Sequence, residues 1–294
     1  MTHGSSYEHY YVPTQSKWPA VGAIGLGTTV LGIVGLIHHN VTGHYLFFAG
    51  SLIIAYMIFG WFKDVIHESM SGLYSKQMDR SFRWGMVWFI FSEIMFFAGF
   101  FGALFYTRNL SVPWLGGLGA KASTHALLWP EFKATWPLLT FPDVKLFPSP
   151  REIIDTWGLP ALNTAILLTS GATITWAHWG LTKKFNPKQV IYGLFFTIAL
   201  GISFLSCQAY EYYEAYHHMG LTLGSGIYGS TFFMLTGFHG AHVTIGTIML
   251  ITILIRAMKG HFKPEQHFAF EAVAWYWHFV DVVWLFLFIL VYWL

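Results

Sequence analysis

The chain has 294 residues, of which 55% are hydrophobic, 19% aromatic and only 10% charged. Soluble domains average about 25% charged residues, so this composition indicates a membrane protein. The formal net charge of +2 gives no reason to expect a nucleic-acid partner. The single cysteine, Cys207, excludes an internal disulfide and a cluster of thiolate ligands. The N-terminus lacks the regions of a cleaved signal peptide, so the first apolar segment should stay as an anchor.

Seven stretches reach the roughly 20 apolar residues that a helix needs to cross about 30 Å of hydrocarbon. The short alternating blocks of β-barrel strands are not seen. The sequence therefore predicts an all-α membrane protein with seven transmembrane helices. In chain order we expect them at Trp18–Ile37, Tyr45–Phe62, Trp84–Tyr106, Leu159–Leu181, Val190–Tyr210, Thr231–Ile255 and Phe268–Leu294.

Small and hydroxylated residues indicate how these helices pack. The third stretch has Ala98 and Gly102, and also Gly99 and Ala103, at the four-residue spacing that lets helices approach closely. The fourth stretch is rich in Thr, Ser and Asn, which suit hydrogen bonds between helices of roughly 0.6–2 kcal/mol each.

Basic residues predict the orientation. Long loops weigh little in topology, and the short loops with Lys and Arg all fall on one side, so that side is predicted to be cytoplasmic. The N-terminus is then inside and the C-terminus outside. The residues on the inner side are Lys17, Lys63, Lys76, Arg80, Arg83, Lys183, Lys184, Lys188, Arg256, Lys259 and Lys263.

The remaining basic residues lie in one long loop, at about residues 108–159. This loop has several prolines and the tryptophans Trp114, Trp129 and Trp136. A flexible linker would be rich in Gly and Ser and poor in aromatic residues. We therefore expect an ordered cap on the outer surface.

Glu93 is the one ionisable group in the apolar run between Arg83 and Arg108. A charged group at the centre of a bilayer is costly and often marks function. Three interpretations stay open: a protonated acid that donates a hydrogen bond, a member of a proton relay, or a partner for a buried histidine from another helix. The residues favour the first, because a low dielectric raises the pKa of a carboxyl group.

Two further helices place ionisable residues one turn apart. His239 and His242 share a face of the sixth stretch, and His278 and Asp281 share a face of the seventh, with Glu271 two turns earlier. Such spacing can support metal ligation in a bundle, but a stable site usually needs three or four ligands. We therefore predict a buried polar network that holds helices together, with no catalytic residue and no metal.

Charged residues also gather at the inner ends of two helices. One group is formed by Lys63, Asp64, His67 and Glu68, and the other by Arg256, Lys259 and His261. Basic groups at this interface suit anionic lipid head groups. Ordinary topology-setting charge is the alternative.

Several segments together resemble one family, subunit III of the haem–copper cytochrome c oxidases. They are FKDVIHES, RWGMVWFIFSEIMFFAGFF, ITWAHWGL, QAYEYYEA, GIYGSTFFMLTGFHGAHVTIG and HFAFEAVAWYWHFVDVVWLFLF. The resemblance is collinear over all seven stretches, from about Trp18 to the C-terminus. The EYYEA and EAVAWYWHFVDVVWLF segments are the most specific.

The resemblance implies a two-helix bundle (residues 1–66) and a five-helix bundle (67–294), separated by a V-shaped cleft that holds phospholipids. Where the family often has a second Trp after the first aromatic position, this chain has Phe62. Glu93 matches the membrane-embedded glutamate that carbodiimide modifies in the family. The positions that match the family's lipid contacts are Trp61, Glu68, Arg256, Lys259 and His261.

The resemblance also implies an accessory subunit without a redox centre of its own. Haem and copper belong to subunits I and II, with subunit I as the main contact and cytochrome c as a partner of the complex. The implied role is to stabilise the catalytic subunit, bind phospholipids and support proton uptake and O2 access. Another respiratory complex is a further candidate partner for the long loop.

The enlarged loop resembles bacterial members, which predicts a bacterial inner membrane. The first alternative function is the equivalent subunit of a quinol oxidase, although those relatives commonly lack the first two helices. The second is a free-standing proton or solute transporter, which would more often show inverted repeats or broken helices.

Overall fold

The computed structural model describes residues 11–13, 15–143, 148–183 and 185–294. Every regular element in this part is helical, apart from one isolated bridge between Lys263 and Gln266. The chain divides into two compact units, Met1–Trp84 and Gly85–Leu294, and the boundary falls inside a helix. The predicted all-α class is confirmed.

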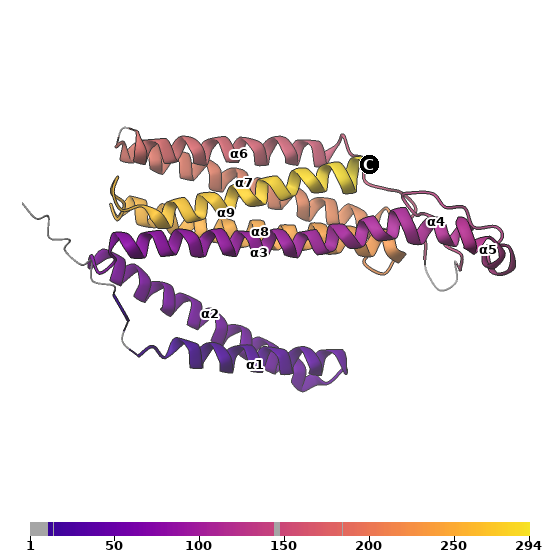
Figure 1. Cartoon of the computed structure of the whole chain (residues 1–294), viewed down its shortest axis with the longest axis horizontal. Coiled ribbons are helices and arrows are strands. Elements are labelled where there is room, and N and C mark those ends of the chain that lie inside the picture. Colours follow the sequence, from indigo (N-terminus) through magenta and orange to yellow (C-terminus); the bar gives the residue numbers. More distant parts are fainter. Residues whose placement is uncertain (1–10, 14, 144–147, 184) are drawn as a thin grey trace, which may run out of the picture. The chain divides into compact units, whose positions relative to one another are not determined.

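The first unit is a helical hairpin followed by the start of a third helix (Figure 1). The hairpin consists of α1 (Trp18–Ile37) and α2 (Val41–Met70), and α3 (Lys76–Tyr106) begins in this unit. Asn40 starts α2, because its side-chain oxygen accepts a hydrogen bond from Thr42 N at 3.0 Å. The positive φ of Gly72, at 72°, lets the chain turn between α2 and α3.

Glycines let the backbones of α1 and α2 touch. A Cβ at Gly32 would lie 2.3 Å from Phe47 N, and a Cβ at Gly50 would lie 2.4 Å from Thr29 N. Neither position has room for a side chain. This contact, which we call the glycine seam, replaces side-chain interlocking with backbone packing.

Trp18 stabilises the open end of the hairpin, where α1 begins. The ring of Trp18 packs directly on Gly60 of α2. A Cβ at Gly60 would lie only 1.9 Å from Cη2 of Trp18, so only glycine fits at this position. Nε1 of Trp18 donates to Oδ2 of Asp64 at 2.7 Å. The buried ring and the bond together fix the start of α1 against the last third of α2.

The second unit is a bundle of long helices. Figure 1 shows α6 to α9 running alongside one another, and α6 packs on both α7 and α9, while α8 packs on α7 and α9. The part of α3 from Gly85 onward lies against α8 and α9 through ring contacts such as Phe96 with Phe238 and Phe89 with Tyr276. The elements are α6 (Leu159–Thr182), α7 (Pro187–His217), α8 (Gly226–Met258), α9 (Phe268–Leu287) and the π-helical η3 (Phe288–Trp293).

Polar side chains link these helices, as the sequence of the fourth stretch predicts. Trp277 Nε1 donates to Ser170 Oγ at 2.9 Å, and Trp284 Nε1 donates to Thr164 Oγ1 at 2.9 Å. Asn163 differs from the prediction: it is 0% exposed, and its side-chain amide has no hydrogen-bond partner among the described residues. The hydroxyl groups of Ser170 and Thr164 therefore join α6 to α9, whereas the side-chain amide of Asn163 does not.

The long loop is ordered where the structure describes it. The helical path of α3 continues through the π-helical η1 (Thr107–Ser111) and α4 (Val112–Leu115), followed by η2 (Gly119–Lys121) and α5 (Ala122–Leu128). Apolar residues of the loop join the core of the second unit: Phe132, Leu138, Phe141 and Ile154 are all at most 8% exposed. Phe141 fills the space beside Gly226 at the start of α8.

Six helices in the described chain are long and apolar enough to cross a membrane, namely α1, α2, α3 with its continuation, α7, α8 and α9. The remaining predicted span, the fourth in chain order, corresponds to α6, whose many hydroxyl groups lower its hydropathy, so the count of seven stays a prediction. Most helices extend beyond the predicted limits, because a helix continues past the apolar run that identifies it.

The small residues of α3 do not serve the predicted close packing within the chain. No heavy atom of the described residues lies within 4 Å of a Cβ built at Gly99 or Gly102. The close approach lies instead in the glycine seam between α1 and α2, where Gly35 and Gly43 also meet backbone to backbone.

Candidate functional site

Glu93 lies on α3 and contacts a histidine of α8. Oε2 of Glu93 is 3.0 Å from Nε2 of His242, and the two side chains are 22% and 14% exposed. The contact joins residues 149 positions apart in the sequence. Of the three interpretations of Glu93, this geometry supports the third, in which Glu93 pairs with a histidine from another helix.

The hydrogen bonds of His242 limit where its protons lie. Nδ1 is 2.7 Å from the carbonyl oxygen of Phe238, which can only accept, so Nδ1 carries a hydrogen. A neutral ring then presents a lone pair at Nε2, and Glu93 must donate its proton there. The alternative is an imidazolium facing a carboxylate. In both states the pair shares one proton.

Aromatic rings surround the pair. The ring centre of Phe97 lies 5.0 Å from that of His242, and Tyr276 stacks on the same imidazole at 6.3 Å with an interplanar angle of 16°. Phe96 and Phe279 lie on further sides, at 6.0 and 6.5 Å. Such apolar surroundings favour two groups that share a proton over two separated charges.

His239 faces a different environment from His242. Its Nε2 is 3.2 Å from the carbonyl oxygen of Val280 on α9, and its ring packs on Phe204 and Trp284. The residue is 1% exposed. The two histidines are one turn apart as predicted, but His239 joins α8 to α7 and α9, whereas His242 joins α8 to α3.

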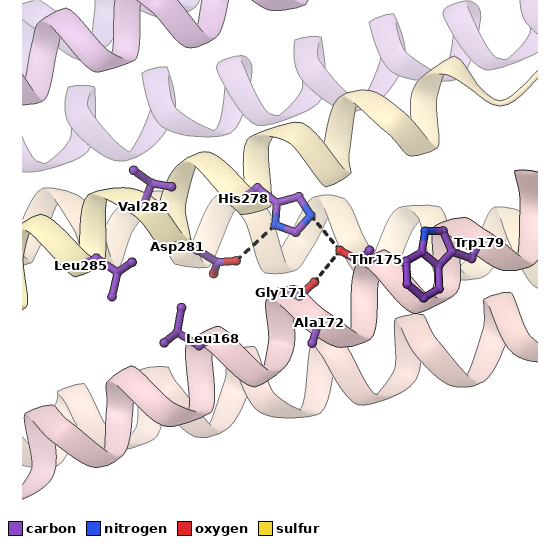
Figure 2. Close-up of a pocket in the computed structure, with 9 residues that line it drawn as sticks. All are labelled: Leu168, Gly171, Ala172, Thr175, Trp179, His278, Asp281, Val282 and Leu285. Atoms are coloured by element: carbon purple, nitrogen blue, oxygen red, sulfur yellow. Dashed lines mark hydrogen bonds and ion pairs between the residues drawn. The ribbon is translucent and has the colours of Figure 1, made fainter.

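His278 and Asp281 line a pocket between α6 and α9 (Figure 2). Nδ1 of His278 is 3.5 Å from Oδ2 of Asp281, and Nε2 is 3.3 Å from Oγ1 of Thr175. Gly171 of α6 leaves room for the carboxyl group of Asp281, because a Cβ at Gly171 would lie only 2.5 Å from Oδ2 of Asp281. His278 and Asp281 share a helix face as predicted, and Thr175 links this pair to α6.

Glu271 belongs to a separate group at the end of α9. Its Oε1 is 3.2 Å from Nε2 of His267 and 3.5 Å from Nε2 of His178. The predicted network of His239, His242, Glu271, His278 and Asp281 is therefore at least three local groups. His242 joins α8 to α3, whereas the groups around His278 and around Glu271 both join α6 to α9.

Glu211 is an interaction centre that the sequence reasoning did not single out. It is 2% exposed, and its Oε1 accepts hydrogen bonds from Gln208 at 3.1 Å and from the hydroxyl of Tyr292 at 2.6 Å. The signal was present in the EYYEA segment, where a glutamate lies among aromatic residues in an apolar helix. The tyrosine two positions from the chain end had no signal of its own.

In the first unit, Glu68 is held by two tyrosines. The hydroxyl of Tyr74 donates to Oε2 at 2.7 Å and that of Tyr11 donates to Oε1 at 3.2 Å. Burial and the bond to Glu68 raise the pKa of Tyr74 above its ordinary value of 10.0. Trp61, one of the predicted lipid contacts, is 52% exposed on the same helix.

The other predicted lipid contacts lie in the second unit, where α8 ends. Arg256 is 9% exposed, and its guanidinium lies over the ring of Phe262 at 4.8 Å from the centroid. Burial and the charges of Arg256 and Lys259 lower the pKa of His261. Because the two sets belong to separate units, their binding to one lipid stays a prediction.

These features define a class, a multi-pass helical membrane protein whose ionisable groups are paired between helices. Residues 8–294 match the family model described as cytochrome c oxidase subunit III. The cytochrome c oxidase subunit 3 of Drosophila melanogaster is 44% identical over 289 residues, covering 97% of this chain and 96% of the relative. That of Dugong dugon is 41% identical over 294 residues, covering 100% and 99%.

The chain belongs to the cytochrome c oxidase subunit III family. It is therefore part of an oxidoreductase complex with other oxidase subunits, and a multi-pass membrane protein. The resemblance recognised from the sequence is confirmed. Both of these relatives are animal proteins, so the predicted bacterial source stays a prediction.

Proposed function

We propose that the chain is the accessory, non-redox subunit of an aa3-type cytochrome c oxidase, in which electrons pass from cytochrome c to O2 and drive proton pumping. Haem and copper are held by subunits I and II, and subunit I is the main contact. This chain stabilises the catalytic subunit, holds structural phospholipids and supports proton uptake and O2 access.

The Glu93–His242 pair carries the proposal of a supporting role. The pair holds one proton, and its second histidine nitrogen donates to the carbonyl of Phe238. A backbone carbonyl has no proton to pass on, so a transferred proton would stop there. The pair suits the joining of α3 to α8 near a proton route better than the repeated transport of pumped protons.

The charged residues at the helix ends support the proposed phospholipid sites. Arg256 is fixed by its stacking on Phe262, and Lys259 caps the same helix end, which suits a phosphate group. Glu68, oriented by Tyr11 and Tyr74, suits a head-group amine. Trp61 and His261 complete the proposed contacts. That both sets bind phospholipid in one V-shaped cleft is the part that rests on the family resemblance.

We place the chain in the inner membrane of a bacterium, with its N-terminus in the cytoplasm and its C-terminus in the periplasm. The enlarged loop at 108–159 supports the bacterial assignment, and the one-sided distribution of Lys and Arg supports the orientation. The loop contacts another oxidase subunit or a neighbouring respiratory complex.

Purification of the native complex through a tag on this chain tests the proposal. Haem a absorbance, copper and cytochrome c oxidation should co-purify with the chain, and the chain alone should be colourless. Oxidation of quinol without oxidation of cytochrome c would favour the quinol oxidase alternative. Transport of protons or solutes by the chain alone in vesicles would overturn the proposed accessory role.

A further inference from the structure

Three side chains from two segments converge where α6 ends and α9 begins. His178 comes from the last turns of α6, His267 precedes α9, and Glu271 lies in its first turn. Their ligating atoms all lie within 4.8 Å of one another. It is the one such group of three among the described residues.

Hydrogen bonding gives His267 the tautomer of a metal ligand. Its Nδ1 is 3.3 Å from the carbonyl oxygen of Lys263, which can only accept, so Nδ1 carries the hydrogen. Metal-bound histidines commonly donate their second nitrogen to a backbone carbonyl in this way. The neutral ring then directs the lone pair of Nε2 at Oε1 of Glu271, 3.2 Å away.

A lone pair facing a carboxylate oxygen requires a positive species between them. A shared proton would satisfy the two atoms of His267 and Glu271. Nε2 of His178 also lies 3.5 Å from the same Oε1, although it is buried and forms no hydrogen bond of good geometry among the described residues. A proton serves two atoms, whereas a metal ion can serve all three.

The distances fit a tetrahedral zinc-type ion. Zinc binds histidine nitrogen and carboxylate oxygen at about 2.0–2.2 Å, so neighbouring ligand atoms in a tetrahedron lie about 3.3–3.5 Å apart. The two distances from Oε1 of Glu271 are 3.2 and 3.5 Å. A small rotation of one imidazole would close the remaining edge between the histidines.

The side chains are both held in place and reachable. Phe270 is 1% exposed, and its ring stacks on His178 with centroids 5.6 Å apart and an interplanar angle of 21°. The side chains of His178, His267 and Glu271 remain 29%, 11% and 13% exposed. The stacked ring of His178 is therefore held in place, and all three side chains keep some exposure to solvent.

We propose that His178, His267 and Glu271 bind one divalent transition-metal ion of the zinc class, with a fourth position open to water. The ion would join α6 to the start of α9. This departs from the sequence-based expectation of no metal ligand, and it is independent of the proposed accessory role, since zinc supplies no redox centre.

Zinc binding to the purified oxidase complex tests the proposal. Equilibrium dialysis against ⁶⁵Zn²⁺ should reveal one more zinc per wild-type complex than per His178→Gln/His267→Gln complex, with affinity at this site weakened about 100-fold or more. Glu265→Gln is the matched control, because it removes an exposed carboxylate from the same loop outside the group and should leave zinc binding unchanged.

Crystals of the wild-type complex equilibrated with Zn²⁺ give a second measurement that needs no variant. An anomalous peak at the zinc edge should lie among the three side chains. Equal zinc binding by the wild type and the double variant, or a map without that peak, would overturn the proposal. The three groups would then share protons only.

Discussion

At the scale of single residues, the shared proton of Glu93 and His242 sets the consequence of replacing either partner. Glutamine at position 93 keeps the shape and can still donate to Nε2 of His242. Alanine leaves a mostly buried imidazole nitrogen unsatisfied, which costs about 1–3 kcal/mol. Glu93 and His242 therefore stabilise the second unit through the one hydrogen bond that they form between α3 and α8.

We expect the Glu93→Gln complex to retain subunit III as firmly as the wild type and to pump the same number of protons per electron. The Glu93→Ala complex should lose the subunit at a lower temperature, because the bond between α3 and α8 is gone. Retention is measured by subunit content after heating, and pumping by pH changes outside vesicles. Halved pumping in Glu93→Gln with stable turnover would make Glu93 a carrier of pumped protons.

The bond from Tyr74 to Glu68 predicts a stability that depends on alkaline pH. The pKa of Tyr74 is raised in the folded state, so the stabilising contribution is complete below the ordinary value of 10.0 and is lost as pH rises above it towards the folded pKa. The wild type should be more heat-stable than Tyr74→Phe at pH 8, and this advantage should shrink by pH 11. The temperature of subunit release measures it. An advantage that stays constant between the two pH values would contradict the prediction.

At the scale of helices, the glycine seam explains how two strongly apolar helices form a specific hairpin. An added methyl group at Gly32 meets the backbone of Phe47, which cannot move as a side chain can. Overpacking of this kind typically costs about 1–3 kcal/mol. Gly27 lies on the same helix, yet a Cβ there meets nothing within 4 Å.

Gly32→Ala and Gly27→Ala are thus a matched pair with opposite expected effects. Gly32→Ala should destabilise the hairpin, whereas Gly27→Ala should be neutral or stabilise α1 by up to about 1 kcal/mol, since alanine favours the helix. Limited proteolysis of the turn at residues 38–40 in the purified complex compares the two. Equal cleavage of both variants would show that the backbone contact is not limiting.

Helix existence could be predicted from the sequence, but helix partners could not. Apolar runs gave α1 at its observed bounds, Trp18–Ile37, because the run and the helix end together. In α3 the small residues predicted a packing face, although Gly99 and Gly102 have open space within the chain. Spacing identifies residues on one face of one helix, and what lies opposite depends on the whole bundle.

At the scale of the whole molecule, the same limit applies to the candidate sites. Glu93 could be selected from the sequence, because one acid interrupts an apolar run. Its partner His242 could be selected only as half of a pair with His239, which the structure places in a different group. His267 and Glu271 are four residues apart at the start of α9, but His178 comes from α6, so no local spacing could have predicted the three together. The family resemblance supplied the role of the complex, which no single residue in this chain carries.

The orientation of the whole chain is the last prediction, and the chain is well suited to test it because Cys207 is the only cysteine. In a Cys207→Ser background, single cysteines can be placed at Ser71, in the exposed turn after α2, and at Lys121, exposed in the long loop. Lys and Arg in short loops stay in the cytoplasm, so Ser71 is predicted inside and Lys121 outside. In sealed right-side-out vesicles, a membrane-impermeant maleimide should label Lys121→Cys at once and Ser71→Cys only after the membrane is opened with detergent. The reverse pattern would place the N-terminus outside, together with the helix ends at Glu68 and Arg256. Arg256 would then lie away from the anionic lipids of the cytoplasmic leaflet, which would contradict its proposed role there.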